Sequence, residues 1–230
     1  NALMPGMIVK LSVGLIGSNG FVGQSINKFL QKNEDLSVTC ITRENYEESK
    51  VKKEYDLIIN AAMPSKRFWA KINPNLDFQE TVKKTFNILN DWKCSKIIQI
   101  SSISARSQLN TTYGRHKAAA EKIVSDENNL IVRLGPMYGE RLNKGVLIDI
   151  LKNDHVYISQ ESLYCFAPVN WVGEWISKNI NLSGIYEIGG NNAINLKKVA
   201  DKIGSTSTFS GPIDHQVLSK EIKNAPEARN

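Results

Sequence analysis

Apolar residues follow two different periodicities along the chain, and segments of the two kinds alternate. Short runs rich in β-branched residues predict strands over Ile8–Ile16, Leu36–Thr42, Tyr55–Ala62, Lys96–Ile100, Leu130–Leu134 and Gly184–Ile188. Between them, apolar residues recur at helical spacing, which predicts helices over Phe21–Gln31, Leu76–Trp92, Tyr113–Val124 and Asn195–Ile203. The run YDLIINAA is almost continuously apolar, which is typical of a strand covered on both faces.

Strands that alternate with helices predict βαβ units and therefore a parallel sheet. We expect an α/β fold with a doubly wound parallel sheet, formed as a single domain over residues 1–230. The alternation is lost between residues 136 and 183. We expect a reduced C-terminal substrate-binding lobe there, completed by residues 205–230.

Composition narrows the choice of partners. The chain has 230 residues, of which 41% are hydrophobic and 23% charged, an ordinary balance for a globular protein. A net charge of +6 would suit nucleic acid, but the lysines are scattered and no basic run alternates with aromatic residues. We therefore expect no nucleic-acid partner, and a basic surface that attracts phosphate-bearing ligands at most. No apolar run is long enough for a membrane span, so no membrane partner is expected.

From the cysteines and histidines we expect neither disulfide bonds nor a metal site. Cys40, Cys94 and Cys165 are far apart and odd in number, so we expect reduced packing residues in a cytoplasmic protein. The first ten residues lack the apolar core of a signal peptide. His155 and His215 have no partner at metal-ligand spacing, and we expect no metal site.

The stretch GLIGSNGFVG holds glycines at positions 17, 20 and 23, directly after a predicted strand and at the start of a predicted helix. In this context Gly17 permits the tight turn, Gly20 lets the backbone approach a pyrophosphate, and Gly23 lets helix and strand pack closely. Backbone N–H groups at the helix N-terminus then face the anion. The candidate cofactor loop is Gly17, Ser18, Asn19, Gly20, Phe21, Val22 and Gly23.

The end of the second predicted strand bears on the cofactor. An acidic residue at this place would bind the ribose 2′-hydroxyl of NAD, whereas the chain has Thr42 and Arg43. An arginine accommodates the 2′-phosphate of NADP, so NADP is favoured. Glu44 is adjacent, and NAD stays open as the alternative.

Tyr113 and Lys117 stand four positions apart on a predicted helix, so they share one face. A phenol has a pKa near 10, and a neighbouring ammonium group stabilises the phenolate, so we expect Lys117 to lower the pKa of Tyr113. A hydroxyl that holds the substrate oxygen completes such a site. Ser101 and Ser102 end the strand that contains KIIQI, which places both at the edge of the sheet where ligands bind.

Together these segments resemble the short-chain dehydrogenase/reductases, which implies a Rossmann fold formed as a single NAD(P)-binding domain over residues 1–230. The closer resemblance is to the extended branch, the NAD-dependent epimerase/dehydratase family that acts on nucleotide sugars. It covers nearly the whole chain in the right order, and its segments are GSNGFVG (17–23), YDLIINAA (55–62), KIIQISS (96–102), YGRHKAAAE (113–121), VRLGPMYG (132–139), FAPVNWVGEWI (166–176) and GIYEIGGNNAINLKKVADKIG (184–204).

The resemblance implies a role for each matching residue. Tyr113 takes the place of the acid/base, Lys117 that of its partner, which also binds the nicotinamide ribose, and Ser102 that of the hydroxyl, which it matches better than Ser104 does. Three further residues match the segment along the cofactor ribose and nicotinamide, and two match the loop beside the nicotinamide: Asn60, Ala61 and Ala62, then Pro136 and Met137.

The chain departs from the family pattern in places that bear on the reaction. Family dehydratases carry an Asp-Glu pair after the hydroxyl residue, but Ile103 and Ser104 stand there, which argues against a dehydratase. The family's helix asparagine falls on Thr81. The resemblance then implies a 4-keto-(nucleotide-)sugar reductase in which Tyr113 acts as the acid, with a nucleotide sugar as small-molecule substrate.

Two other readings stay open. One is a nucleotide-sugar 4-epimerase with tightly bound NAD. The other, of a different class, is a non-catalytic module that senses NADP.

In the family, the helices that match Leu76–Trp92 and Tyr113–Val124 often meet in a dimer, which implies a homodimer. His116 is expected to be exposed or packed, and four loop cations are candidates to bind a substrate phosphate: Lys66, Arg67, Arg141 and Lys144.

Overall fold

The computed structural model describes residues 9–230, so Ile8, where the first strand was expected to begin, lies outside the described residues. Six parallel strands form the central sheet in the order β2-β1-β3-β4-β5-β9. Their bounds are β1 (Leu11–Ile16), β2 (Leu36–Ile41), β3 (Tyr55–Asn60), β4 (Cys94–Ser102), β5 (Leu130–Leu134) and β9 (Gly184–Ile188). The predicted parallel sheet is confirmed.

The chain reverses its direction of travel across the sheet between β1 and β3. β2 lies on one side of β1, and β3, β4, β5 and β9 follow on the other. In doubly wound sheets, ligands bind beyond the carboxyl ends of the strands at this reversal. The topology therefore places a ligand site next to the loop that follows β1.

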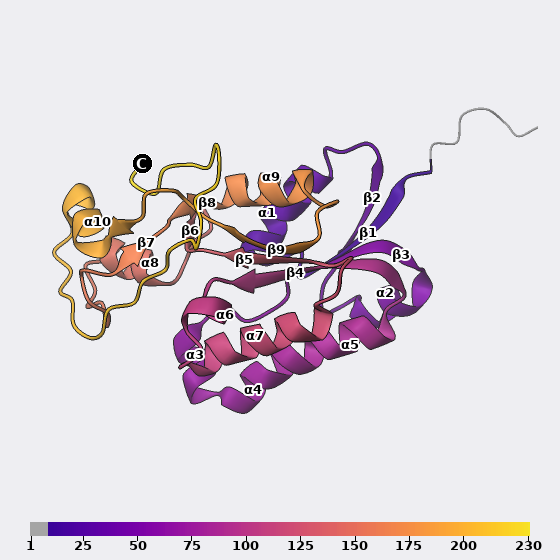
Figure 1. The fold of residues 1–230 in the computed structure, drawn as a ribbon, viewed down its shortest axis with the longest axis horizontal. Coiled ribbons are helices and arrows are strands. Elements are labelled where there is room, and N and C mark those ends of the chain that lie inside the picture. Colours follow the sequence, from indigo (N-terminus) through magenta and orange to yellow (C-terminus); the bar gives the residue numbers. More distant parts are fainter. Residues whose placement is uncertain (1–8) are drawn as a thin grey trace, which may run out of the picture.

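Helices cover both faces of the sheet, as Figure 1 shows. On one face lie α1 (Phe21–Leu30) and α9 (Val169–Lys178), and on the other α2 (Tyr46–Lys52), α5 (Lys84–Asp91) and α7 (Thr112–Val124). Each face has its own apolar core. Ile26 and Ile176 belong to the first and Ile88 and Val124 to the second, and all four are at most 1% exposed.

The helix expected over Leu76–Trp92 is a composite. It consists of α4 (Pro74–Phe78), the π-helical turn η1 (Gln79–Lys83) and α5. A π turn places one extra residue in the helical ladder and changes which side chains share a face. Thr81 lies inside this turn and is fully buried.

Several short elements were not expected from the sequence. Two of them, α3 (Arg67–Ile72) and α6 (Ser104–Ser107), occupy the loops after β3 and β4. The others are α2, β6 (Met137–Tyr138), α8 (Val146–Leu151), β7 (Leu163–Tyr164), β8 (Ala167–Pro168) and β10 (Ile194–Asn195). Of the described helices, none is long and apolar enough to cross a membrane.

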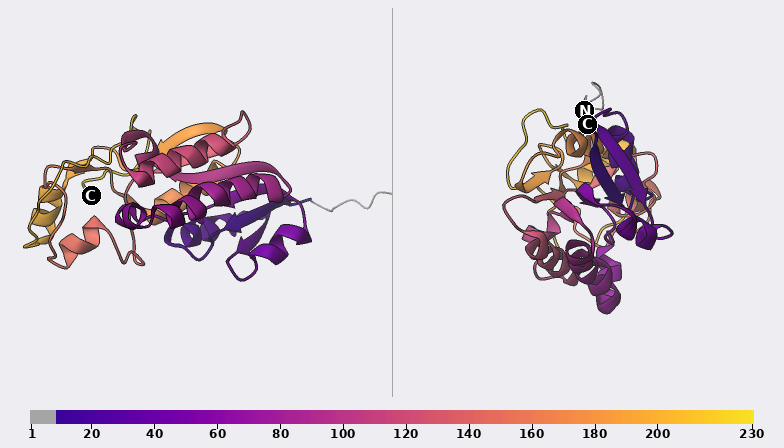
Figure 2. Two further views of the ribbon diagram at one scale, coloured as in Figure 1. Left: turned by 90° about the horizontal axis from the view of Figure 1, so that it is seen from below. Right: turned by 90° about the vertical axis from the view of Figure 1, so that its right-hand side faces the viewer.

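A smaller lobe lies at one end of the sheet, where Figures 1 and 2 show α8, β7 and α10 (Leu196–Ile203) close together. It has a separate apolar core that includes Ile150, Tyr164 and Leu196. The lobe differs from the segments expected for it, because α9 falls within 136–183 yet packs on the sheet, while α10 falls outside both segments yet belongs to the lobe. Residues 205–230 form an extended strap along it, paired to β7 at Gln216.

The contact between α1 and α9 depends on a glycine. A Cβ at Gly173 would stand 2.6 Å from the backbone carbon of Ser25, whose hydroxyl donates to the carbonyl of Val169. Gly173 therefore sets the distance between the two helices on this face.

We predict that Gly173→Ala lowers the free energy of unfolding by about 1–3 kcal/mol, because the added methyl group forces α1 and α9 apart. Urea unfolding followed by circular dichroism measures this. Glu174→Ala, at the next position, where the side chain is 41% exposed, serves as the control and should shift stability by no more than about 0.5 kcal/mol. Equal stability of Gly173→Ala and the parent protein would show that the helices separate without cost.

Candidate active site

The predicted site residues lie at the carboxyl ends of neighbouring strands. Ile16, the last residue of β1, pairs with Ile41 of β2 and with Asn60 of β3. Ser102, the last residue of β4, pairs with Leu134, the last of β5. Because these strands are parallel, the segments that follow them meet at one edge of the sheet. The structure thus brings the glycine loop, the segments after β2 and β3, Ser102 and the segment after β5 to one edge.

The glycine loop adopts the geometry that its spacing predicts. Gly17 has φ +83°, which favours glycine, and a Cβ there would stand 2.8 Å from the backbone of Ala61 and Ala62. A Cβ at Gly23 would stand 2.0 Å from the Gly17 carbonyl oxygen. At Gly20 the nearest atom is 3.3 Å away, so the space above it is more open. The first and third glycines therefore permit close packing within the loop.

The N-terminus of α1 is suited to an anion. Gly20 caps the helix without a side-chain hydrogen bond, and its first turn holds no acidic residue. The N–H groups of the first turn therefore remain available. Ser18 is 4% exposed, and its hydroxyl has no partner in the described structure. An uncapped helix end and an unpartnered buried hydroxyl both fit a dinucleotide pyrophosphate.

The loop after β2 is held by Asn45. Its side-chain Oδ1 accepts from the N–H of Thr42 at 2.7 Å, and its Nδ2 donates to the carbonyl of Cys40 at 3.0 Å. Arg43 is exposed, and no carboxylate of the described residues forms an ion pair with it. An exposed guanidinium without an ion-pair partner can bind a phosphate at the end of β2.

Asn60 differs from the other expected cofactor residues. It is fully buried, donates to Gln99 Oε1 at 3.0 Å and accepts from the N–H of Ala62 at 3.3 Å. Its side chain therefore stabilises the sheet edge, while Ala61 and Ala62 are half-buried. After β5, Met137 pairs with Ala167 and the Pro136 carbonyl accepts from the Ala167 N–H, which ties this loop to the lobe.

Tyr113 and Lys117 lie on α7, which begins at a side-chain cap. Thr111 Oγ1 accepts from the N–H of Gly114 at 3.0 Å. A Cβ at Gly114 would stand 2.1 Å from the carbonyl oxygen of Gln108, so α6 and α7 can meet this closely only at a glycine. Tyr113 and Lys117 are 7% and 4% exposed, and the Lys117 Nζ is 5.1 Å from the centre of the Tyr113 ring.

Of the serines near the end of β4, Ser102 is the one whose hydroxyl acts on Tyr113. Ser101 donates to Glu121 at 2.6 Å, and Ser104 donates to Gln108 at 2.9 Å. Hydrogen bonding by Ser102 lowers the pKa of the Tyr113 phenol. The role of Ser102 stays a prediction from the sequence.

Burial dominates the protonation of the pair. It raises the pKa of Tyr113 to about 12, although Ser102 and the charge of Arg67 act in the opposite direction. It lowers the pKa of Lys117 to about 7, although the charges of Asp77 and Glu121 oppose this change. The expected lowering of the Tyr113 pKa is thus not found, because burial outweighs the surrounding charges.

The sequence suggested that Arg67 could bind a substrate phosphate, but the Arg67 guanidinium is already engaged by other side chains. Its guanidinium forms an ion pair with Asp214 at 2.6 Å and donates to Tyr164 at 3.0 Å. Gln108 joins the same cluster through Arg67 at 3.2 Å. The Arg67 charge holds the pKa of Asp214 below its usual range against the effect of burial. This cluster fastens the strap to the segment that precedes α7.

His116 has a partner that the sequence did not suggest. Its Nδ1 lies 2.6 Å from Oδ2 of Asp77 on α4, and its ring makes an edge contact with Phe78. The Asp77 side chain is 1% exposed. The two residues are far apart in the chain, so only the packing of α4 on α7 brings them together.

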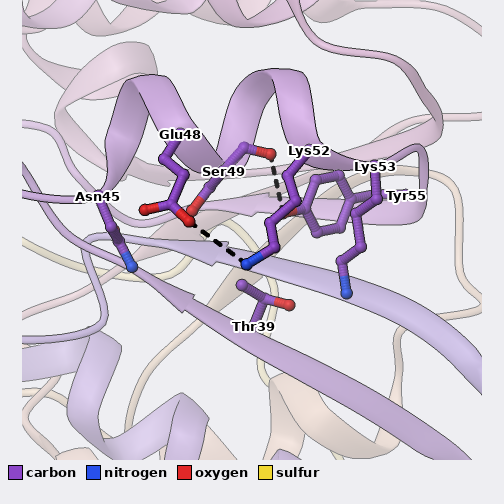
Figure 3. Close-up of a pocket in the computed structure, with 7 residues that line it drawn as sticks. All are labelled: Thr39, Asn45, Glu48, Ser49, Lys52, Lys53 and Tyr55. Carbon is purple, nitrogen blue, oxygen red and sulfur yellow. Dashed lines mark hydrogen bonds and ion pairs between the residues drawn. The ribbon is translucent and has the colours of Figure 1, made fainter.

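Two hollows lie near the sheet edge. One of about 360 Å³ separates the glycine loop from the loop after β6 and is lined by Asn19, Phe21, Gln24, Arg141, Asn143 and Lys144. The other, of about 230 Å³, lies beside α2 (Figure 3). None of the predicted site residues lines the second hollow, and its Lys52 pairs with Glu48. Only the first therefore adjoins the candidate cofactor loop.

Across residues 9–230, no cluster of three histidine, cysteine or carboxylate side chains has the geometry to hold a metal ion. None of the three cysteines forms a disulfide bond.

We predict that Lys117→Met stabilises the protein by about 2–4 kcal/mol at pH 7, because it removes a buried charge. The folded pKa of Lys117 lies below its ordinary value of 10.5, so the unfolded chain binds more protons between about pH 7 and pH 10.5. The gain is therefore largest below pH 7 and fades toward pH 10.5. Urea unfolding across this range measures it, with Lys122→Met on the exposed face of α7 as the control. A gain that does not depend on pH would contradict the lowered pKa.

No protein-family model matches the chain, and no curated protein matches it in sequence. Solved structures match its fold. The chain is similar to UDP-glucose 4-epimerase of Thermotoga maritima, with a TM-score of 0.75, 15% identity, and coverage of 91% of this chain and 90% of that one.

A second similar structure is dTDP-4-dehydrorhamnose reductase of Bacillus anthracis in complex with NADP, with a TM-score of 0.76, 15% identity and 96% coverage of each chain. A third is the UDP-glucose 4-epimerase of Thermus thermophilus in complex with NAD, with a TM-score of 0.70, 18% identity, and coverage of 91% and 90%. The chain therefore shares the Rossmann fold of these structures.

Proposed function

We propose that this protein is an NAD(P)-dependent oxidoreductase that reduces the keto group of a 4-keto (nucleotide-)sugar. The observation that supports the proposal is that Ser102 and the glycine loop follow strands at the same carboxyl edge of the parallel sheet, with Tyr113 close to Ser102 and Lys117 beside the Tyr113 ring. Solved structures with this fold include reductases and epimerases of nucleotide sugars, which supports the class of reaction.

A bound nicotinamide cofactor would supply the hydride. The chain's own residues supply the proton and the geometry. With its pKa raised to about 12, Tyr113 stays protonated at neutral pH and can donate its proton to the substrate oxygen as charge develops there. Ser102 adjoins the phenol and can hold the same oxygen. The ammonium form of Lys117 favours the phenolate that results.

The absence of an acid pair after Ser102 favours simple reduction over dehydration. Ile103 and Ser104 follow Ser102, Ile103 is fully buried, and the Ser104 hydroxyl is bonded to Gln108. Elimination of water needs an acid and a base at the neighbouring carbon. The positions used for that purpose in the related dehydratases hold no such groups in this chain.

The basic mouth of the site supports a substrate that carries phosphate. Arg141 and Lys144 line the hollow beside the glycine loop. The charge of Lys66 acts on Lys144 and, together with burial, lowers the pKa of that ammonium group. Two cations that line the hollow, with a third whose charge acts on one of them, favour a diphosphate-linked sugar. We assign Lys66, Arg141 and Lys144 this role, while Arg67 is held by Asp214.

The 4-epimerase is the second candidate, because it uses the same three catalytic groups. It differs by retaining its NAD through the reaction. A non-catalytic NADP sensor is less well supported, because such a module does not need a buried lysine beside a buried tyrosine.

We also propose a homodimer through α4 and α5. Four large apolar side chains on these helices are exposed by between 39% and 53%, namely Leu76, Phe78, Phe86 and Leu89. A second copy placed against this face would remove them from water.

We predict that the purified protein binds NADPH more tightly than NADH, and that Arg43→Ala weakens NADPH binding roughly tenfold while NADH binding is unchanged. The reason is the loss of a charge-assisted bond to the 2′-phosphate. Fluorescence titration measures both, with Lys53→Ala as an exposed cationic control. NAD released from the protein by denaturation would favour the epimerase, and binding of neither cofactor would overturn the role of the glycine loop.

We predict that Tyr113→Phe reduces kcat for a 4-keto nucleotide sugar by about 10²-fold or more, because the acid is lost. Cofactor affinity and the unfolding midpoint should stay close to those of the parent protein. Tyr157→Phe, at a side chain that is 79% exposed, is the matched control. Activity retained by Tyr113→Phe would remove this tyrosine from the mechanism.

A further inference from the structure

The proposed reaction needs the hydroxyl groups of Ser102 and Tyr113 at one substrate oxygen, yet the two residues belong to different elements. Ser102 ends β4, whereas Tyr113 lies in the first turn of α7. The segment that joins them contains α6, and Gln108 is the residue at which α6 ends. The relative placement of the two hydroxyl groups therefore depends on this short segment.

The backbone of Gln108 ties α6 to the start of α7. Its N–H donates to the carbonyl of Ser104 at 3.0 Å. Its carbonyl accepts from the N–H of Thr111 at 3.0 Å and from the Thr111 hydroxyl at 2.8 Å. Because Thr111 is also the cap of α7, the backbone of Gln108 fixes where the helix of Tyr113 begins.

The side chain of Gln108 is connected to Ser102 through Ser104. The Ser104 hydroxyl donates to Gln108 Oε1 at 2.9 Å. The N–H of Ser104 donates to Ser102 Oγ at 3.2 Å. This second bond occupies one lone pair of the Ser102 oxygen and so restricts the directions in which the Ser102 hydroxyl can donate. Two hydrogen bonds that share Ser104 thus link the Gln108 amide to the Ser102 hydroxyl.

Charged partners fix the orientation of the Gln108 amide. Its Oε1 also accepts from the Arg67 guanidinium at 3.2 Å, and its Nε2 donates to Oδ1 of Asp214. A guanidinium can only donate, and a carboxylate can only accept. A flipped amide would place donor against donor and acceptor against acceptor. The Ser104 hydroxyl must therefore be the donor toward Gln108, and its proton is committed there.

Asp214 is held in turn by the strap and the lobe. Its Oδ1 also accepts from Gln216 Nε2 at 2.9 Å, and its Oδ2 accepts from Arg67 at 2.6 Å and from the Tyr164 hydroxyl at 2.8 Å. Its backbone N–H donates to Ser162 Oγ at 2.9 Å. The Asp214 side chain is 7% exposed. A buried carboxylate with four donors has little freedom to move, so it is a firm support for Gln108.

We propose that Gln108 is a positioning residue that aligns the Ser102 hydroxyl with Tyr113, and that Asp214 on the strap holds Gln108 in place. Neither residue touches the reacting atoms, and each acts through the next side chain in the series. The contacts that fasten the lobe to the sheet and the contacts that align the site are then the same set. The inference rests on the proposed reductase function.

The first test uses the protein without substrate. Nuclear magnetic resonance of ¹³Cζ-labelled tyrosine gives a signal for Tyr113, assigned by its absence from Tyr113→Phe, that reports hydrogen bonding at the phenol oxygen. We expect Ser102→Ala and Gln108→Leu to shift this signal in the same direction. Gln160→Leu, at an exposed position in the lobe, is the matched control and should leave it in place.

Ser104→Ala removes only the side-chain bond to Gln108 and should shift the Tyr113 signal in the same direction as Gln108→Leu. Because it is a small change, it also decides the outcome if Gln108→Leu does not fold. An unchanged Tyr113 signal in either folded variant overturns the proposal.

The second test uses turnover of a 4-keto nucleotide sugar with NADPH. We expect Gln108→Leu to lower kcat about tenfold, with KM within about twofold of the parent value, because alignment is lost while binding is kept. The double variant of Gln108→Leu and Ser102→Ala should be no slower than Ser102→Ala alone, since Gln108 acts through Ser102. Gln160→Leu should keep the parent kcat.

A merely structural contact would instead multiply the two losses. A double variant whose loss in kcat is the product of the single losses therefore overturns the proposal, as does a parent-like kcat in Gln108→Leu. If the parent protein reduces no such sugar, the proposed function fails, while the magnetic resonance result still decides whether Gln108 controls the pair of hydroxyl groups.

Discussion

The pairing of β1 between β2 and β3 is the constraint on which the rest of the molecule depends. β1 is the strand from which the sheet grows in both directions, and its last residue is in register with the ends of both neighbours. This register brings Gly17 against the backbone of Ala61 and Ala62, at a separation that only a glycine allows. The position of the uncapped N-terminus of α1 at the edge of the sheet follows from that contact.

The fold was predictable because its strongest signals are local. Each strand of the parallel sheet is an apolar run that the sequence displays directly, and α1 and α7 show apolar or alanine-rich periodicity. The short helices α2, α3, α6 and α8 escaped prediction. Helices of this length owe most of their stability to tertiary contacts and little to their own residues. The polar run YEESKVK of α2 illustrates the problem, since Ser49 is its one buried residue.

The candidate site likewise has residues that the sequence predicts and partners that it does not predict. Gly17, Ser102, Tyr113 and Lys117 could be proposed because their spacing follows elements visible in the sequence. The partners that set their chemistry could not. Arg67 and Asp214 are 147 positions apart, and Asp77 and His116 are 39 apart, so no local pattern connects them. Burial, which decides the pKa of Tyr113, likewise depends on how α6 and α7 pack.

The π turn in the helix before α5 has a consequence for how this chain tolerates length changes. Removing a single residue from Gln79–Lys83 would restore regular α-helical hydrogen bonding, a change that ordinarily favours a helix. It would also rotate α4 by about 100° relative to α5, which corresponds to one residue of helical advance. Asp77 would then leave the face turned toward α7. A deletion that restores regular helical hydrogen bonding would thus remove the contact between Asp77 and His116.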